Sequence, residues 1–566
     1  MSDYSFASMP SVSIARSKFI RTQPHNTSFN LGELVVVGFD EVIPGSTHKI
    51  DLGSLIRMST PIAPIMDDIQ IDVYSFFVPM RLVWDHWKEF MGESNQAGIA
   101  TTTYTIPMIA PSGTIYGSQI NSVADDLGIF AYQQGVGTWT QINNPISALP
   151  FRGIGKIYNR WFRNQNVEAP LAVNTGDTVS NPAIDAGFNS GVVYSAIAGQ
   201  QATNTTGGAR LKAYKLPDYF TSALPYAQKG DPVQIFGDNA VAPVVTGADT
   251  GVASTTALKF NKFDGTALSL SGDHNIFIGG TGVGHYDTST LSGATGVGIA
   301  PANLWANLSL AVNTTINDLR FAFQLQKALE KDALYGSRYW EVLRAHYAVT
   351  SPDATLQDPE LLGHVKFDIN ISQVVQTTGF TDPSNTNLGT PGANSVTANR
   401  SHLFTASFVE HGYLYHIAVA RQKRHVYSQS CNRLWFRSSR FDFYHPVFAN
   451  LGAQKVYKRE LFGIGNNQTD VFGYQEAWAE YRFLPGYNSG LLNPARANSL
   501  DYWTLADVYT SAPTLGVTFL KEDRSNLARA LVTGSGGPDF IGSFFIKDTV
   551  VNPMPLYSIP GFADHH

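Results

Sequence analysis

Runs of β-branched and aromatic residues recur along the chain and predict β-strands. Turn-forming residues such as Pro44, Gly45 and Pro538 bound several of these runs. The connections between the runs are of very unequal length, and no internal repeat is visible. This pattern predicts a β-sandwich with enlarged connections, and it argues against a βαβ series or a repeat array. The predicted strands occupy residues 33–43, 69–79, 365–376, 413–421 and 539–551.

Helical periodicity is restricted to a few segments. The strongest lies at 316–335, where apolar residues recur three or four positions apart. Thr315 and Asp318 resemble a capping box at its start, and Gly336 is a typical stop. Two further short helices are predicted, at 338–347 and at 81–92.

Residues 234–300 differ from the rest of the chain. These 67 residues contain 12 glycines, 14 serines and threonines, and only 7 charged residues. Such a density of glycine and hydroxyl groups around short apolar runs predicts an exposed, β-rich insertion between framework elements. A connection of this length is expected to be either functional or flexible.

The composition narrows the class of protein. Charged residues make up 15% of the chain, against about 25% in typical soluble domains, and the formal net charge is −6. Few charges suit a surface that is largely covered by neighbouring molecules, although fibre proteins and lectins share this composition. The single cysteine, Cys431, excludes an intrachain disulfide framework and indicates a reducing compartment. Because neither a secretory h-region nor an apolar run of membrane-spanning length is visible, we expect a chain made in the cytosol without stable membrane insertion.

Candidate enzymatic chemistry is sparse. The stretch 151–161, FRGIGKIYNRW, resembles a phosphate loop but lacks both its first glycine and its final Ser/Thr. Asp67, Asp68 and Asp72 could bind calcium, but they lack the glycine and glutamate of an EF-hand loop, so a solvated turn is favoured. No GxSxG elbow occurs. We therefore expect no metal, no cofactor and no enzymatic activity.

One segment is strongly basic in an otherwise acidic chain. Residues 421–440, RQKRHVYSQSCNRLWFRSSR, hold six arginines and lysines, one histidine and no acid. Cations interleaved with aromatic rings are typical of surfaces that bind single-stranded nucleic acid. The alternative is a set of solvated or interface-paired cations whose neighbouring aromatic rings lie in the core.

Seven collinear blocks between residues 25 and 562 carry a family resemblance. The most specific is INDLRFAFQLQKALEKDALYGSRYWEVLRAHYAVTSPDATLQDPELLG, and others are VYSFFVPMRLVWDHWKEFMGE, LPDYFTSALPYAQKG and FDFYHPVFANLGAQ. Together they resemble the major capsid protein of the Microviridae, small icosahedral phages with single-stranded DNA, and most closely the gokushovirus branch. The resemblance spans nearly the whole chain.

The resemblance implies an all-β fold, an eight-stranded single jelly roll with long insertions and a few short helices. It also implies a T=1 shell around a circular single-stranded DNA genome, assembled in the host cytoplasm and present in the virion. The partners implied are an internal scaffolding protein, a small basic DNA-binding protein and a DNA pilot protein. The expected organisation is a jelly-roll core at 1–233 and 313–566, interrupted at 234–312 by a variable insertion that forms a protrusion at the three-fold axes and meets a host surface receptor.

Two sets of candidate site residues follow. Cations that face inward would screen packed phosphate, so the N-terminal arm and segment 421–440 are expected on or near the inner face of the shell. The DNA-facing candidates are Arg16, Lys18, Arg21, Arg421, Lys423, Arg424, Arg433, Trp435, Arg437 and Arg440. The host-binding candidates, all in the insertion, are Asp264, His274, His285 and Tyr286.

Two other functions remain open from the residues alone. A phage fibre or lectin-like β-sandwich would bind carbohydrate through the Gly/Ser/Thr-rich insertion, and it would be a small oligomer rather than a closed shell. A polysaccharide-cleaving β-sandwich would need paired carboxylates in a groove, and the sequence nominates none.

Overall fold

The computed structural model divides the chain into two compact units. The first comprises Met1–Ala227 with Tyr335–His566, and the second is Gln228–Leu334. None of the helices in the part of the chain described is long and apolar enough to cross a membrane. The structure describes residues 15–93, 104–109, 122–129, 145–179, 210–231, 233, 316–335, 338–350, 352, 356–375, 377, 389, 391–465, 469–494 and 496–557, together with short strands between 244 and 306.

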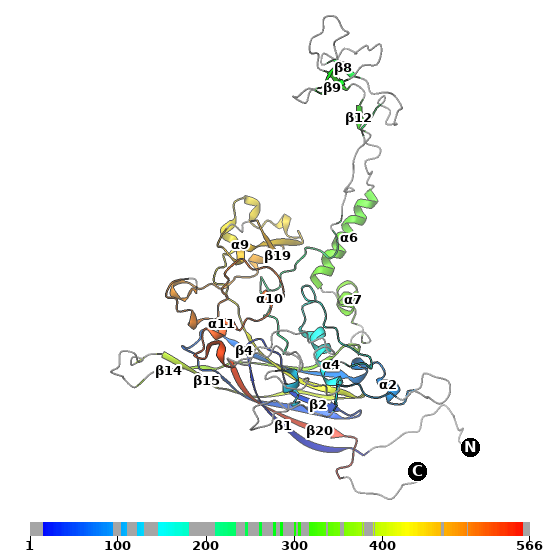
Figure 1. Cartoon of the computed structure of the whole chain (residues 1–566), viewed down its shortest axis with the longest axis vertical. Coiled ribbons are helices and arrows are strands. Elements are labelled where there is room, and N and C mark those ends of the chain that lie inside the picture. Colours follow the sequence, from blue (N-terminus) through cyan, green and yellow to red (C-terminus); the bar gives the residue numbers. More distant parts are fainter. Residues whose placement is uncertain are drawn as a thin grey trace, which may run out of the picture. The chain divides into compact units, whose positions relative to one another are not determined.

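The first unit is built around two four-stranded antiparallel sheets (Figure 1). The strand order of the first sheet is β1-β20-β3-β16, and that of the second is β13-β4-β17-β2. The strands of the first sheet are β1 (Ser17–Phe29), β3 (Thr47–Met58), β16 (Thr397–Ser407) and β20 (Phe540–Asn552). Those of the second are β2 (Val35–Val42), β4 (Ile69–Pro79), β13 (Glu360–Asp368) and β17 (Gly412–Gln422).

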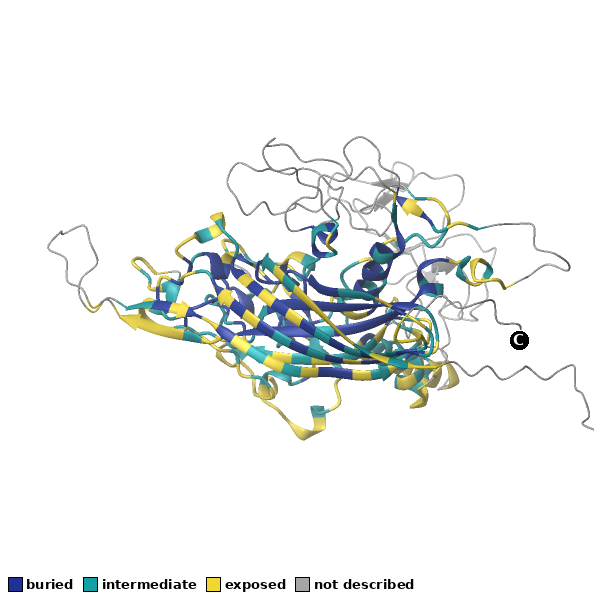
Figure 2. Ribbon diagram, turned by 90° about the horizontal axis from the view of Figure 1, so that it is seen from below, coloured by how far each residue is buried: buried dark blue, intermediate teal, exposed yellow. Residues whose placement is uncertain are grey.

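The two sheets bury different numbers of faces. Along β20, buried and accessible residues alternate without a break, so the first sheet packs on one face and exposes the other (Figure 2). Strands β4 and β17 are buried at nearly every position, so the second sheet is covered on both faces. The residues that share the core between the sheets include Phe29, Leu52, Ile71, Leu414 and Phe544.

A helical layer covers the other face of the second sheet. Helix α1 (Met80–Val83) and helix α4 (Leu149–Ile157) contribute Val83 and Phe151 to a cluster that includes Tyr415 of β17. A Cβ atom at Gly153 would lie 2.2 Å from the Tyr415 hydroxyl, which itself donates to the carbonyl of Pro150 at 2.8 Å. The glycines of the phosphate-loop-like stretch therefore allow close packing of a helix on the sheet.

A third cluster joins residues after position 426 to the segment around Phe220. It gathers Phe220, Tyr427, Val456 and Phe519 around a two-stranded sheet. The elements here are β18 (Ala453–Tyr457), α9 (Lys458–Leu461), β19 (Val471–Glu476) and α10 (Val517–Leu520).

Most predicted strands are confirmed. Strands β2, β4, β17 and β20 lie where the apolar runs predicted them. The single strand predicted at 365–376 is wrong, because the chain leaves β13 after Asp368 and starts β14 at Ile371. The Ile369 N–H still bonds the carbonyl of Ile69, which lies opposite it at the start of β4, but the Asn370 N–H bonds the Thr397 hydroxyl, so the ladder with β4 ends there. Strands β1, β3 and β16 were not predicted.

The helix predictions are confirmed in two cases out of three. Helix α6 is Ile316–Tyr335 and α7 is Tyr339–Tyr347, while Thr315 and Gly336 lie outside the described residues. The helix predicted at 81–92 is wrong as a single element. It is split into α1 and α2 (Trp87–Phe90) because Trp84 adopts an extended backbone, with its side chain fully buried and its indole N–H bonded to Asp177.

The second unit contains α6 and short paired strands. Strand β7 (Val244–Thr246) pairs with β12 (Leu304–Ala306), β8 (Phe260–Lys262) with β11 (Ile299–Pro301), and β9 (Ile276–Ile278) with β10 (Gly284–Tyr286). The pairs are nested, as in one long hairpin whose two arms are joined at successive levels.

The remaining elements are short. They are α3 (Val123–Asp126), the π-helix η1 (Tyr158–Phe162), α11 (Ser525–Ala528), β5 (Met108–Ile109), β6 (Ile146–Ser147), β14 (Ile371–Val375), β15 (Pro391–Ser395) and the 3₁₀ turns η3 (Arg433–Phe436), η4 (Arg440–Asp442), η5 (Pro446–Phe448), η6 (Ala479–Tyr481), η7 (Gly490–Leu492), η8 (Asp501–Trp503) and η9 (Gly534–Gly536).

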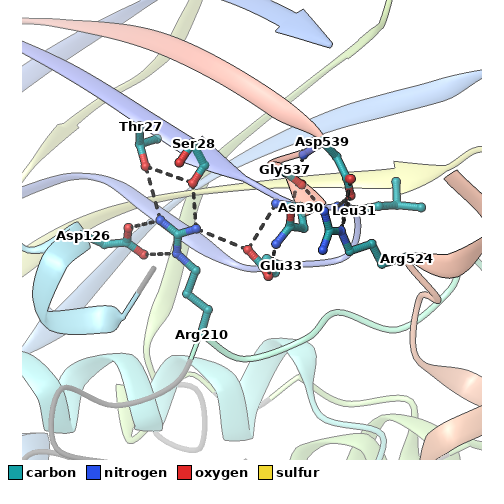
Figure 3. Close-up of polar contacts among 10 residues, drawn as sticks. All are labelled: Thr27, Ser28, Asn30, Leu31, Glu33, Asp126, Arg210, Arg524, Gly537 and Asp539. Carbon is teal, nitrogen blue, oxygen red and sulfur yellow. Dashed lines mark hydrogen bonds and ion pairs between the residues drawn. The ribbon is translucent and has the colours of Figure 1, made fainter. Parts of the chain in front are cut away.

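A buried polar network holds the corner where the chain passes from β1 to β2 (Figure 3). The guanidinium of Arg210 donates to both carboxylate oxygens of Asp126, at 2.6 and 2.9 Å, and to Glu33 at 3.2 Å. It also donates to the Ser28 carbonyl at 2.9 Å and to the Thr27 hydroxyl at 3.2 Å. Burial alone lowers the pKa of Arg210, but the two carboxylates raise it overall, so the guanidinium remains charged in the interior.

A second ion pair completes the same corner. Asp539, directly before β20, accepts from the Leu31 N–H at 3.0 Å and from the Arg524 Nε–H at 3.1 Å. Burial raises the pKa of Asp539 to about 6, although Arg524 opposes that shift. The corner at residues 30–33 is thus tied to the start of the last strand, more than 500 residues away.

The variant Arg210→Met should lose about 3–5 kcal/mol of unfolding free energy, because it leaves two buried carboxylates without their counter-charge. Urea denaturation of the purified chain, followed by tryptophan fluorescence, measures this loss. The matched control Arg57→Met removes an exposed arginine of β3 and should change the unfolding free energy by less than about 0.5 kcal/mol. Equal effects of the two variants would contradict the role assigned to Arg210.

Candidate nucleic-acid interface

Segment 421–440 runs from the end of β17 into the third cluster. It contains the last two residues of β17, an irregular stretch and the turn η3, and it ends at the first residue of η4. Its cations therefore lie in several different environments.

Arg421 is paired inside the second sheet. Its Nε donates to the Asp72 carboxylate at 3.0 Å, and its Nη2 contacts both Asp72 and the Tyr74 hydroxyl. Asp72 also bonds His364 at 3.0 Å and Gln70 at 2.6 Å. Burial lowers the pKa of Arg421, but the neighbouring Tyr74 and Asp72 raise it overall. Arg421 thus links β17 to β4.

The solvated turn expected for the three aspartates is wrong. Asp72 is fully buried in β4, where Arg421 neutralises it. Asp67 accepts from the Leu505 N–H at 2.6 Å, and burial raises its pKa. Only Asp68 is exposed, and it pairs with Arg424. The three carboxylates have three different partners, which explains their spacing without a calcium ion.

Four more cations of the segment have carboxylate partners. Lys423 pairs with Asp368 at 2.8 Å and Arg424 with Asp68 at 3.2 Å, both at the surface. The other two are more buried: Arg433 pairs with Glu460 at 3.3 Å, and Arg437 with Glu480 at 3.6 Å. The acids that the segment lacks in sequence are supplied by the rest of the chain.

Two of the DNA-facing candidates, Trp435 and Arg440, have side chains that are accessible to solvent. The Trp435 side chain is 75% exposed in η3. The guanidinium of Arg440 lies 4.5 Å from the centroid of the Phe441 ring, and it makes no ion pair with the described residues. Of the ten DNA-facing candidates, these two and Arg424 are the most available in segment 421–440.

The histidine of the segment is buried. His425 lies 3.3 Å from Asp507 through Nδ1 and 3.3 Å from Glu522 through Nε2, and all three side chains are almost fully buried. Burial lowers the pKa of His425, but Glu522 and Asp507 raise it overall to about 9. Lys215 also pairs with Asp507, at 2.9 Å. The cluster is held together by charge, and His425 is a structural cation near neutral pH.

A pocket of about 520 Å³ opens beside η3 and η4. Arg459 lies in its wall, with its guanidinium 4.4 Å from the centroid of Phe436 and 5.1 Å from that of Tyr457. Asp442 and Glu480 also line the pocket and offset part of the positive charge. Its chemistry suits a planar or anionic group of small size.

The N-terminal candidates separate by strand face. Arg16 precedes β1 and is exposed, and Lys18 is exposed on the outer face of the first sheet. Arg21 instead points toward the interior edge and contacts both Asp40 and Asp548. Within the described residues, Asp40, His48 and Asp548 are the one group with potential metal-ligand atoms within 4.8 Å of one another. The guanidinium of Arg21 contacts both carboxylates, and His48 contacts Asp548 as well, so this group favours ion pairing over a metal.

The outer face of the first sheet carries positive charge that the sequence analysis missed. Along this face the described cations make no ion pair with any described carboxylate, and the one acid, Asp51, pairs with His402 at 2.8 Å. Lys18 was already a sequence-based candidate, and Lys547 lies in the predicted strand β20, but the cations of β3 and β16 were overlooked because those strands were not predicted. The cations are Lys18, Lys49, Arg57, Arg400 and Lys547.

The host-binding candidates are only partly placed. His285 and Tyr286 belong to β10, whose backbone pairs with β9. Asp264 and His274 lie outside the described residues. Their assignment stays a prediction.

Comparison with known proteins gives matches over nearly the full chain. Residues 7–562 match the family described as "Capsid protein (F protein)". The chain is 36% identical over 563 residues to "Capsid protein VP1" of Bdellovibrio phage phiMH2K, covering 98% of this chain and 97% of that protein. It is 35% identical over 552 residues to "Capsid protein VP1" of Spiroplasma virus 4, covering 95% and 94%. It is 33% identical over 609 residues to "Capsid protein VP1" of Chlamydia phage 1, covering 98% and 97%.

The buried pairing of His425 predicts a pH dependence of stability. The pKa of His425 is raised from 6.5 to about 9 by folding, so its stabilising contribution is complete below pH 6.5 and is lost as the pH rises through 9. The contribution is on the order of 3 kcal/mol. Thermal unfolding of wild type and His425→Gln between pH 6 and 10 should therefore show a difference that shrinks with rising pH. The control His402→Gln, at an exposed site, should parallel wild type, and a constant difference for His425→Gln would refute the assignment.

Proposed function

Because the chain belongs to the F protein family of capsid proteins, it is a structural component of a phage virion, and we propose that it builds a T=1 icosahedral shell around a circular single-stranded DNA genome. The observation that carries this proposal is the length of the similarity. Each of three capsid proteins aligns over more than nine-tenths of its own chain and of this one. Both the framework and its large connections are therefore those of a capsid protein.

We propose that the two sheets form an eight-stranded single jelly roll. The strand orders β1-β20-β3-β16 and β13-β4-β17-β2 support it. Taken in chain order, the strands pass between the sheets at every step except from β4 to β13, which are neighbours in one sheet. This alternation is that of two interlocked Greek keys, the arrangement of many viral shell domains.

Exposed apolar side chains around the third cluster support assembly. Trp435, Val447, Leu484 and Tyr487 are all at least 75% exposed. Such a concentration is unusual on the surface of an isolated soluble chain and is typical of protein contact surfaces. Together with the low charge content, it fits a subunit whose surface is covered by copies of itself.

We propose further partners from the family resemblance. They are an internal scaffolding protein during assembly, a small basic DNA-binding protein and a DNA pilot protein. We also propose that the insertion at 234–312 forms the three-fold protrusion and contacts a host surface receptor. The nested strand pairs support an insertion that leaves the framework and returns to it.

The purified chain, co-expressed with its scaffolding protein, should form closed isometric particles. Light scattering coupled to gel filtration, with negative-stain microscopy, measures mass and shape. The reason for expecting closure is the full-length match to shell-forming proteins. A stable monomer or trimer that binds glycans, obtained with the scaffold present, would contradict the shell and favour a fibre or lectin.

Deleting residues 240–300 and joining the ends should leave assembly intact but reduce adsorption to host cells at least tenfold. The deletion removes β7 to β10 and most of β11, and with them all three strand pairs of the insertion, but no residue of the two large sheets. Adsorption is measured as the fraction of particles removed from solution by cells. Deleted particles that adsorb normally would refute the attachment role.

A further inference from the structure

We propose that the outer face of the first sheet, formed by β1, β20, β3 and β16, is the surface that contacts the packaged single-stranded DNA. This inference rests on the proposed function, since it assumes a shell with a DNA interior. It assigns the contact to a sheet face that no sequence motif marked.

The register of the sheet sets out the cations in successive cross-strand rows. Lys18 is in the first row, level with Val551 and Thr47, and Lys49 is in the second. Lys547 is in the third, Arg400 in the fourth, and Arg57 in the sixth. Rows on one face are about 6.7 Å apart along the strands, so positive charge recurs along the whole sheet.

The charge on this face is not neutralised from within. Within the described part of the chain, none of these five cations has a carboxylate within ion-pair distance, and Asp51 is the one acid among them. The excess of positive charge attracts a polyanion, and release of condensed counterions would drive the binding of phosphates. On segment 421–440, by contrast, five of six cations are paired with described acids.

Apolar groups on the same face suit unpaired bases. Phe545 is 46% exposed at the centre of the sheet, beside Gly53 of β3. Gly53 has no side chain to cover the Phe545 ring, whose Cδ1 lies 3.9 Å from where a Cβ atom of residue 53 would be. Ile20 and Ile541 are also exposed on this face, 64% and 57%. Sites that bind single-stranded nucleic acid combine cations, which contact the phosphates, with aromatic or apolar side chains, on which the bases stack. In a duplex the base faces are stacked on one another and cannot make such contacts.

The geometry separates this face from the basic segment. In Figure 1, β1 and β20 lie on one side of the first unit, whereas β19 and α9, beside the pocket at η3 and η4, lie on the other. A shell has one inner face, so a subunit that turns the first sheet toward the genome turns Arg433, Trp435 and Arg437 away from it. Of the ten DNA-facing candidates, Lys18 is on the sheet face and Arg16 directly precedes its first strand.

The first test measures binding of the full-length chain to a fluorescent thirty-residue oligothymidylate at several salt concentrations. The variant Lys49→Gln/Arg400→Gln/Lys547→Gln removes three sheet cations. It should lower the slope of log K against log salt by about 2, since each lost phosphate contact removes about 0.7. The matched control Lys423→Gln/Arg424→Gln/Arg440→Gln removes three exposed or partly exposed cations of the basic segment and should leave the slope unchanged. Circular dichroism and thermal unfolding confirm that both variants fold.

The opposite results overturn the inference. A slope that falls only in the control would place the DNA on segment 421–440. Equal losses in both variants, or none in either, would show that no particular face binds DNA. Normal DNA binding by the sheet variant together with lost particle formation would place a protein on this face instead.

The second test addresses stacking. Phe545→Ala should weaken oligothymidylate binding about tenfold, Phe545→Trp should restore it, and an abasic oligonucleotide should not distinguish the three proteins. An equal loss for the abasic oligonucleotide would overturn a stacking role for Phe545.

DNA content per particle separates this inference from the proposed function. Closed particles of the sheet variant that hold less nuclease-protected DNA than control particles support both. Closed particles with unchanged DNA overturn the inference and leave the shell standing. If wild type forms no closed particles but the oligonucleotide slope still falls in the sheet variant, the shell fails and the DNA-binding face stands.

Discussion

The corner between β1 and β2 is the constraint on which both sheets depend. A chain that crosses from one sheet to the other buries backbone groups that no ladder can satisfy. Here the Ser28 carbonyl is bonded by Arg210, the Leu31 N–H by Asp539, and the Gly32 N–H by the carbonyl of Ala420. Gly32 has a φ of +79°, and a Cβ atom there would lie 2.4 Å from Glu522, so both conformation and space require glycine. The contacts at this corner hold the end of β1 next to the start of β20, in the register that places Lys18 level with Val551.

Whether a charged side chain of this protein has an ion-pair partner depends largely on how deeply it is buried. The acids that balance segment 421–440 include Asp72 in β4 and Glu460 in α9, both buried, and such pairs hold elements together because an unpaired charge in the interior would be costly. The outer face of the first sheet shows the opposite situation, since its cations are accessible to solvent. Lys49 and Lys547 on that face form no ion pair with the carboxylates of the described residues. The chain therefore presents one positively charged face although its formal net charge is −6.

The second sheet provides the surface on which the long segments between strands pack. Since β4 and β17 are buried on both faces, long connections can pack on them without exposing the core between the sheets. The helical layer around Phe151 and the third cluster around Tyr427 are each separate from that core. A capsid protein can vary these connections, and with them its contacts, while the two sheets stay the same.

The family can be read from the sequence, as the full-length matches confirm, and so can the strands that prove to be buried on both faces. Strands β4 and β17 and helix α6 carry strong local signals, because continuous apolar runs and helical spacing are properties of neighbouring residues. The half-exposed strands β3 and β16 mix lysine, serine and glycine with their core residues, so their local signal is weak. Tertiary structure alone decided which charges are free. Arg421 and Asp72 are 349 residues apart in sequence but form one ion pair, whereas Lys49 pairs with no carboxylate among the residues that the structure describes. Ion pairing depends on distance in space, and a list of residues does not contain that distance.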